Sequence, residues 1–147
     1  MEIGLITVGA CTGVTLLIVV VSIAVTASRT RTYQRTLEKL FAGRSQQTPQ
    51  QFHDRYFAAK GIPFFVTSGV LKVLENELQA DLSRLAADDD FAGNLAFLRG
   101  KLEHPETMLS LEKVFEVTIS ESDVHEMGTT VEDVVLLVWR TLNKKRK

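Results

Sequence analysis

Cysteine is nearly absent from this sequence, and that scarcity already excludes several kinds of protein. The only cysteine is Cys11, so one chain can form neither an internal disulfide nor a CxxC metal or redox site. A single cysteine does not indicate whether the protein resides in an oxidising or a reducing compartment. A domain needs on the order of 100 residues to bury its own core. A chain of 147 residues therefore has room for one modest domain and an anchor, but not for two domains.

Charge is missing from residues 3–27. A helix of this length, at about 1.5 Å per residue, exceeds the roughly 30 Å of hydrocarbon in a bilayer. A soluble domain of this size could not enclose a helix that is apolar on every side. We therefore expect residues 1–28 to form a single-pass transmembrane anchor.

Basic side chains begin directly after the uncharged run: Arg29, Arg31, Arg35, Lys39 and Arg44. Before the run, Glu2 is the only charged side chain. Because the positive flank of a span stays inside, the N-terminus is expected outside and the C-terminal domain in the cytoplasm, at the inner or cell membrane.

Two processed forms compete with the anchor. Residues 25–27, Val-Thr-Ala, have the small side chains of a cleavage site, but no basic segment precedes the run. The run also exceeds the roughly 7–15 residues of a signal-peptide core. A lipoprotein signal at Cys11 would require the apolar stretch to end there, whereas it continues. Gly9 and Gly13 form a GxxxG pair through which two spans could make a homodimer.

The remaining charges are unevenly distributed. Residues 45–143 hold 16 acidic and 8 basic side chains, a net of −8, while the flanks hold the other 9 basic residues. The flanks are expected to face membrane lipid, and the acidic body would repel a nucleic-acid backbone. The basic tail, residues 144–147, is expected to contact the membrane or to act as a solubilising end.

Apolar spacing predicts an all-α fold beyond the anchor. A stalk helix should reach Gly43, and Thr48 should cap a short helix that ends at Gly61. Further helices are expected over residues 70–78, from Pro105, very briefly at 122–127, and after Thr130. A long polar loop should follow the helix of residues 70–78. Three apolar residues should hold this loop against the core: Leu82, Leu85 and Phe91. Residues 64–67 have strand-like composition but are too short to build a sheet.

Enzyme motifs are absent from the sequence. It contains no serine elbow, no glycine-rich phosphate loop and no paired-carboxylate signature. Residues 88–90, three consecutive aspartates, lack the spacing of a calcium loop and are better explained as a solvated cluster that caps the loop. The three histidines have no partners at metal-ligand spacing and are interpreted as surface residues. We expect no catalytic residue, no metal and no cofactor.

Three segments resemble the acyl carrier protein family. Residues 111–120, LEKVFEVTIS, are similar to its second major helix and the isoleucine that follows. Residues 122–135, SDVHEMGTTVEDVV, resemble its short helix and the start of its last helix, and residues 90–95 resemble its first loop. The resemblance covers roughly residues 66–142. It implies a small helical bundle with a long first loop at residues 64–143, after a juxtamembrane stalk and linker at 29–63.

The serine on which that family carries phosphopantetheine is missing. Its position falls on Lys101 in one register, within Gly100-Lys101-Leu102, and on Arg99 in the other. Between Ser83 and Ser110 the only hydroxyl is that of Thr107. The resemblance therefore implies the scaffold without the prosthetic arm. A cation at a helix start is mildly unfavourable, which hints at a role for Lys101 or Arg99.

Three functions remain open at this stage. The first is a membrane-tethered binding module without enzymatic activity, which docks an unknown protein partner. The resemblance places its acidic docking face at Glu103, Glu106, Glu112 and Glu116. The second is a membrane-bound carrier that is still modified, at a non-standard site such as Thr107. The third is a structural subunit of a membrane complex, in which the anchor matters most.

Overall fold

The computed structural model describes residues 32–145, and within this range the chain is helical. The stalk helix spans residues 32–40. The later elements are α2 (Pro49–Tyr56), η1 (Ala58–Lys60), α3 (Phe64–Leu78), η2 (Ala96–Leu98), α4 (Arg99–Leu102), α5 (Pro105–Phe115), α6 (Glu121–His125) and α7 (Val131–Lys145). The only strand-like pairing in the described range is a single bridge between Asp90 and Thr130. The prediction of an all-α fold is confirmed for this range.

The predicted anchor, residues 1–28, lies outside the described residues, and so do Gly9 and Gly13. Among the helices of residues 32–145, none combines the length and the apolar composition that a membrane span requires. The anchor therefore stays a prediction.

Local signals fix where several helices begin. At α2, Thr48 accepts a hydrogen bond from the Gln51 backbone at 3.2 Å, and the Gln51 side chain accepts one from the Thr48 backbone at 2.8 Å. This is the predicted capping box, with Pro49 in the first turn. Thr130 and Asp133 make the same reciprocal pair at α7. These caps satisfy backbone N–H groups that the first turn of a helix leaves free.

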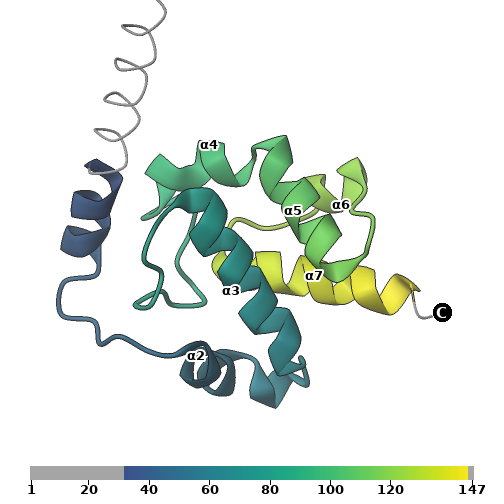
Figure 1. Ribbon diagram of the computed structural model, residues 1–147, viewed down its shortest axis with the longest axis horizontal. Coiled ribbons are helices and arrows are strands. Elements are labelled where there is room, and N and C mark those ends of the chain that lie inside the picture. The colour runs from purple at the N-terminus through teal and green to yellow at the C-terminus, as the bar shows by residue number, and fades with distance from the viewer. Residues whose placement is uncertain (1–31, 146–147) are drawn as a thin grey trace, which may run out of the picture.

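Helices α3, α5 and α7 form the bundle, with α6 as a short helix beside α5 (Figure 1). Helix α3 crosses α5 closely at Gly69, where an added Cβ would lie 2.6 Å from the Phe115 ring. Apolar side chains of α7 fill the space beneath, with Val131, Val134, Val135 and Val138 fully buried. The predicted stripe of the last helix therefore faces the core.

A long connection of residues 79–95 follows α3. The three predicted apolar residues hold it against the core, because Leu82, Leu85 and Phe91 are each no more than 3% exposed. The end of the connection differs from the prediction of a continuous loop, since residues 96–102 form the short helices η2 and α4. The side chains of Leu98 and Leu102 are buried and pack these helices against the core.

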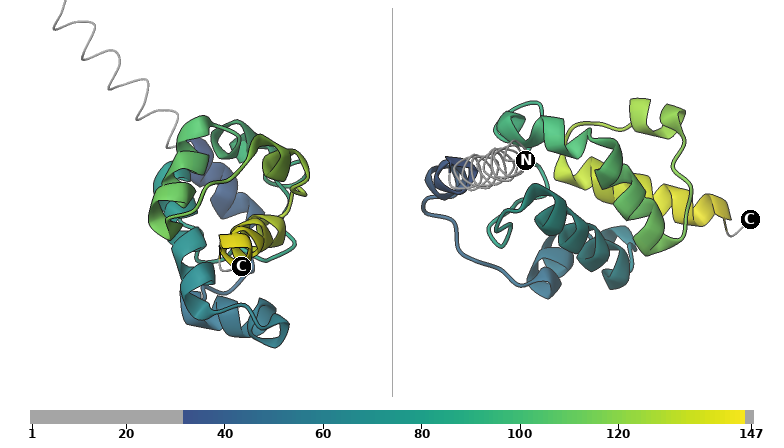
Figure 2. Two further views of the ribbon diagram at one scale, coloured as in Figure 1. Left: turned by 90° about the vertical axis from the view of Figure 1, so that its right-hand side faces the viewer. Right: turned by 45° about the horizontal axis from the view of Figure 1, so that its top comes forward.

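The stalk helix and α2 also pack into the core. Leu37, Phe41 and Phe52 are each 2% exposed, and Phe57 is fully buried. These side chains belong to the same apolar cluster as α3, α5 and α7. The stalk and linker region therefore packs with the predicted 64–143 domain, and Figure 2 shows it alongside the bundle in two further views.

Candidate partner-docking face

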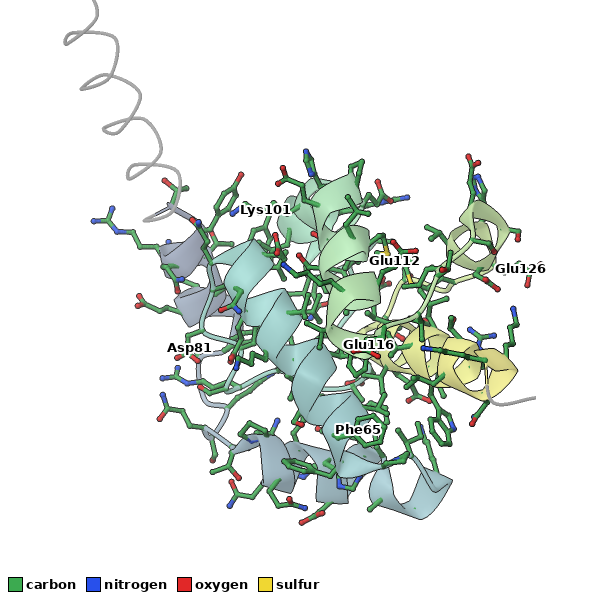
Figure 3. The ribbon with its side chains drawn as sticks, turned by 45° about the vertical axis from the view of Figure 1, so that its right-hand side comes forward. Phe65, Asp81, Lys101, Glu112, Glu116 and Glu126 are labelled. Atoms are coloured by element: carbon green, nitrogen blue, oxygen red, sulfur yellow. The ribbon has the colours of Figure 1, made fainter. Side chains whose placement is uncertain are left out.

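Lys101, one of the two residues at the expected modification position, is tied into the fold. Its Nζ donates to the Leu78 carbonyl at the end of α3 over 3.1 Å, and it lies 5.0 Å from the centre of the Tyr33 ring on the stalk helix. Figure 3 shows Lys101 at the end of the molecule where the stalk begins. The cation therefore stabilises a helix C-terminus and joins three elements.

Arg99, the other residue at this position, lies on the surface of α4. Its Nε donates to Glu103 Oε1 at 2.6 Å, one helical turn away. The hydrogen bond and charge of Glu103 raise the pKa of the Arg99 guanidinium. Both side chains are about half exposed, so the pair contributes little to stability and mainly removes two free charges from this surface.

Thr107 offers no exposed hydroxyl for a modification. The residue is 1% exposed, and its Oγ1 donates to the Lys101 carbonyl at 2.7 Å. This bond connects the first turn of α5 to α4 and satisfies a hydroxyl that burial would otherwise leave unpaired. Attachment of a bulky group here would require α5 to leave the core.

The structure spreads the four predicted docking glutamates along one side of α4 and α5. Glu103 and Glu106 lie at the start of α5 and Glu112 and Glu116 at its end, with Leu109 between them. The Glu106 side chain is 77% exposed, and its nearest basic group is His104 at 3.8 Å. Glu116 is also exposed. Of the four, Glu106 and Glu116 are therefore the freest to meet a partner.

Glu112 has an internal role that the sequence did not reveal. Its Oε1 accepts a hydrogen bond from the Ile119 backbone at 2.6 Å, across the turn that follows α5. Figure 3 shows the side chain directed from α5 toward α6. Substitution of Glu112 would therefore disturb the turn as well as the charge of the face.

Sequence reasoning also missed two exposed apolar side chains of α5. Leu109 is 59% exposed and Val114 is 55% exposed. The apolar spacing gave no signal for them, because it shows only that a stripe exists and not that further apolar residues face outward. Leu109 lies three residues from both Glu106 and Glu112, so the helix presents an apolar centre with acidic neighbours.

Helix α6 extends the acidic surface. Ser120 caps this helix by accepting a hydrogen bond from the Asp123 backbone at 3.1 Å. Lys144 and Ser120 both donate to the Asp123 carboxylate and lower its pKa to about 2, with the Lys144 bond the larger cause. Lys145 donates to the Glu116 carbonyl at 2.6 Å. The first two residues of the predicted basic tail are thus part of α7 and contact the acidic body.

The aspartate cluster of residues 88–90 is only partly solvated. Asp88 is exposed, whereas Asp89 is 2% exposed and accepts two hydrogen bonds from Arg44, at 2.7 and 2.9 Å. The interpretation of the whole cluster as solvated was therefore wrong for Asp89, which a cation from the linker allows to be buried. No group of three or more potential metal ligands occurs among residues 32–145.

The surface interpretation was also wrong for one histidine. His53 is 8% exposed, its Nε2 lies 2.8 Å from the Ile62 carbonyl, and its ring packs edge-on against Phe64. It joins α2 to the start of α3. His104 and His125 are exposed, as predicted.

A hollow of about 420 Å³ lies between α4 and α6, next to the acidic docking face. Phe91, Leu102, Val124 and Met127 supply its apolar wall, and the polar side chains Arg99, Glu103 and His125 complete it. The volume is within the range that holds small ligands, although the hollow is open on one side.

No family model, no curated protein and no solved structure matches the chain. The resemblance to acyl carrier proteins therefore rests on the sequence segments described above and stays a prediction.

Proposed function

We propose that this protein is a membrane-tethered binding module that has the acyl carrier type of scaffold, carries no phosphopantetheine arm and docks a protein partner on the outer face of α5. The observation that supports this most is the exposed Leu109 between Glu106 and Glu116, on a helix whose opposite side is buried. An apolar centre with a charged rim is the usual anatomy of a protein interface.

The charge of this face indicates which kind of partner it would bind. Residues 99–126 contain seven acidic side chains against three basic ones, a net of −4. A face of this sign attracts basic partners and speeds their association at low salt. The partner is therefore expected to present lysines or arginines around an apolar side chain, and binding should weaken as salt rises.

The order of the helices also supports the proposal. A long helix, a pinned connection, a second major helix, a very short helix and a last helix follow one another in α3, α5, α6 and α7. At the modification position this scaffold holds Lys101 and Arg99, both already bonded to neighbouring groups. In this proposal the scaffold has kept its docking surface and exchanged its modification site for internal contacts.

The tether belongs to the same proposal. Residues 3–27 would span the inner or cell membrane, with the N-terminus outside and the described helices on the cytoplasmic side. No enzymatic role is assigned, and the docked protein would act close to the bilayer.

Charge reversal on the outer face tests the proposal. We expect the double variant Glu106→Lys, Glu116→Lys to recover about tenfold less of the partner than the original chain does, because repulsion replaces attraction on both sides of the apolar centre. The measurement is a quantitative pull-down of the full chain from membranes of its own host. Asp54→Lys, on α2 away from this face, is the matched control and should leave recovery unchanged. Equal recovery by the double variant would exclude this face.

Two experiments distinguish the alternative functions. An intact mass equal to that of the unmodified chain would exclude the carrier, and an added phosphopantetheine would exclude our proposal. The buried hydroxyl of Thr107 favours the first result. Exchange of residues 3–27 for an unrelated span should preserve function if docking is the role, and abolish it if the chain is a structural subunit.

A further inference from the structure

The point where the described chain begins lies beside one end of the bundle. Tyr33 stacks on Phe97 of η2 with ring centres 6.1 Å apart, and Lys101 of α4 lies over the same ring. Figures 1 and 2 show α4 next to the start of the stalk helix, and α2 at the far end of the molecule. The chain therefore enters the bundle at the end formed by η2 and α4.

The stalk helix is fixed to that end at several points. The Gln34 side chain donates to the Gln79 carbonyl at 2.8 Å, and Leu37 and Phe41 are buried in the core. Beyond the helix, Arg44 holds Asp89 through two hydrogen bonds. These contacts hold the stalk helix against the bundle, so the direction in which the chain enters is coupled to the orientation of the other helices.

The uncharged run ends close to this point in sequence. Five residue steps separate Ala27 from Thr32, and a fully extended chain covers at most about 18 Å in that number of steps. If residues 3–27 span a bilayer, Thr32 lies within reach of the lipid headgroups. Because Phe97 of η2 and Lys101 of α4 contact the neighbouring Tyr33, these two elements lie at a similar depth.

The stalk carries the charge that an anionic bilayer attracts. Residues 29–40 hold four basic side chains against Glu38 alone, whereas on α4 Arg99 is paired with Glu103, and Lys101 shares a hollow with Glu77 and Glu106. Arg35 and Lys39 are exposed on the stalk helix, and Arg29 and Arg31 precede it in sequence. Basic residues close to an anionic lipid surface are attracted to it.

From these observations we propose that the end of the bundle formed by η2, α4 and the stalk helix rests on the anionic headgroups of the membrane, held there by the contacts of Tyr33 with Phe97 and Lys101. This inference rests on the proposed anchor and adds a second contact between the protein and the lipid. It assigns Lys101 a positioning role.

The experiment measures how close two sites of the full chain lie to the headgroups. In a Cys11→Ser background, a fluorophore is attached to Gly100→Cys on α4, where an added side chain meets open space, or to Ala59→Cys on η1 at the far end. The chain is reconstituted into vesicles that contain phosphatidylserine and a lipid with a nitroxide on its headgroup. We expect several-fold stronger quenching at residue 100 than at residue 59. Equal quenching, or stronger quenching at residue 59, would overturn the inference.

Two further arms separate the causes. The double variant Tyr33→Ala, Lys101→Ala should reduce the difference between the two sites, because it removes the contacts that hold η2 and α4 against the start of the stalk helix. Vesicles of neutral lipid should reduce it as well. An undiminished difference in either arm would contradict the role assigned to those contacts or to charge. Extraction of the chain from the vesicles by alkaline carbonate would refute the proposed anchor itself. Retention with equal quenching would refute only the orientation.

Discussion

Asp89 lies where the linker, the long connection and the last helix meet. Its carboxylate accepts hydrogen bonds from Arg44, from the Ala86 backbone at 2.7 Å and from Asn94 at 2.6 Å. Its backbone carbonyl accepts one from Val131, the first residue of α7, at 3.0 Å. Burial acts to raise the pKa of this carboxyl, but the three sets of hydrogen bonds outweigh it and hold the pKa below its ordinary value.

Removal of this carboxylate should be costly. We expect Asp89→Ala to lower the free energy of unfolding by about 2–3 kcal/mol, because Ala86 and Asn94 lose their acceptor inside the protein. Asp88→Ala, one residue away and exposed, should change it by less than about 0.5 kcal/mol. Urea unfolding of the full chain in mild detergent, followed by the fluorescence of Trp139, measures both. Equal effects of the two substitutions would show that Asp89 does not hold the junction.

The same carboxylates predict how stability depends on pH. Asp89 and Asp123 both have a folded pKa below the unfolded value of about 3.9. Their contribution is fully present above that value and is lost as the pH falls through the lower folded pKa. The melting temperature should therefore stay level from pH 7 to about 5 and fall below about 4. Asp89→Asn should melt lower at pH 7 and approach the original chain in acid. A constant gap between the two curves would contradict the assignment.

Among the elements, the crossing of α3 and α5 depends on Gly69. Gly69→Ala should cost about 1–3 kcal/mol, since the added Cβ would lie 2.6 Å from the Phe115 ring, which is buried and must tilt. Gly100→Ala is the matched control, because α4 leaves open space there and alanine favours a helix by up to about 1 kcal/mol. Thermal melts followed by circular dichroism compare the two. Equal destabilisation by both substitutions would mean that crowding is not the cause.

The sequence predicted the helices with strong local signals. Helix starts are indicated by a cap or a first-turn proline, which acts within four residues of the start. These signals are Thr48 with Gln51, Pro105, and Thr130 with Asp133. The start of α3 was placed too late for the opposite reason. Residues 64–67 lack a capping side chain and have β-branched and aromatic composition, and only packing of Val66 and Thr67 makes them helical.

The parts that the sequence could not predict depend on contacts between distant segments. Helix α4 is only four residues long and is stabilised by Leu102 in the core and by Lys101 on the end of α3. The internal role of Glu112 becomes apparent only when Ile119 is placed beside it. At the candidate site, sequence reasoning therefore predicted the acidic residues but not which of them are free.

For the whole molecule, the central feature is that the stalk shares the core. Phe41→Ala should lower the free energy of unfolding by about 3–5 kcal/mol, as truncation of a buried phenylalanine does. Arg35→Ala, on the exposed side of the stalk helix, should have almost no effect. Urea unfolding of the two variants compares them. An effect of Phe41→Ala below about 1 kcal/mol would show that the stalk and the bundle unfold separately.

The contact between Lys145 and Glu116 affects where a tag can be attached when this protein is used in a pull-down. It places the end of α7 beside one of the two freest residues of the acidic docking face. An affinity tag or fluorescent protein attached directly behind Lys145 would therefore start next to the surface under test and shield it from the partner. An insertion at η1, where Ala58 and Ala59 are exposed and which is not part of the docking face, would leave that surface open.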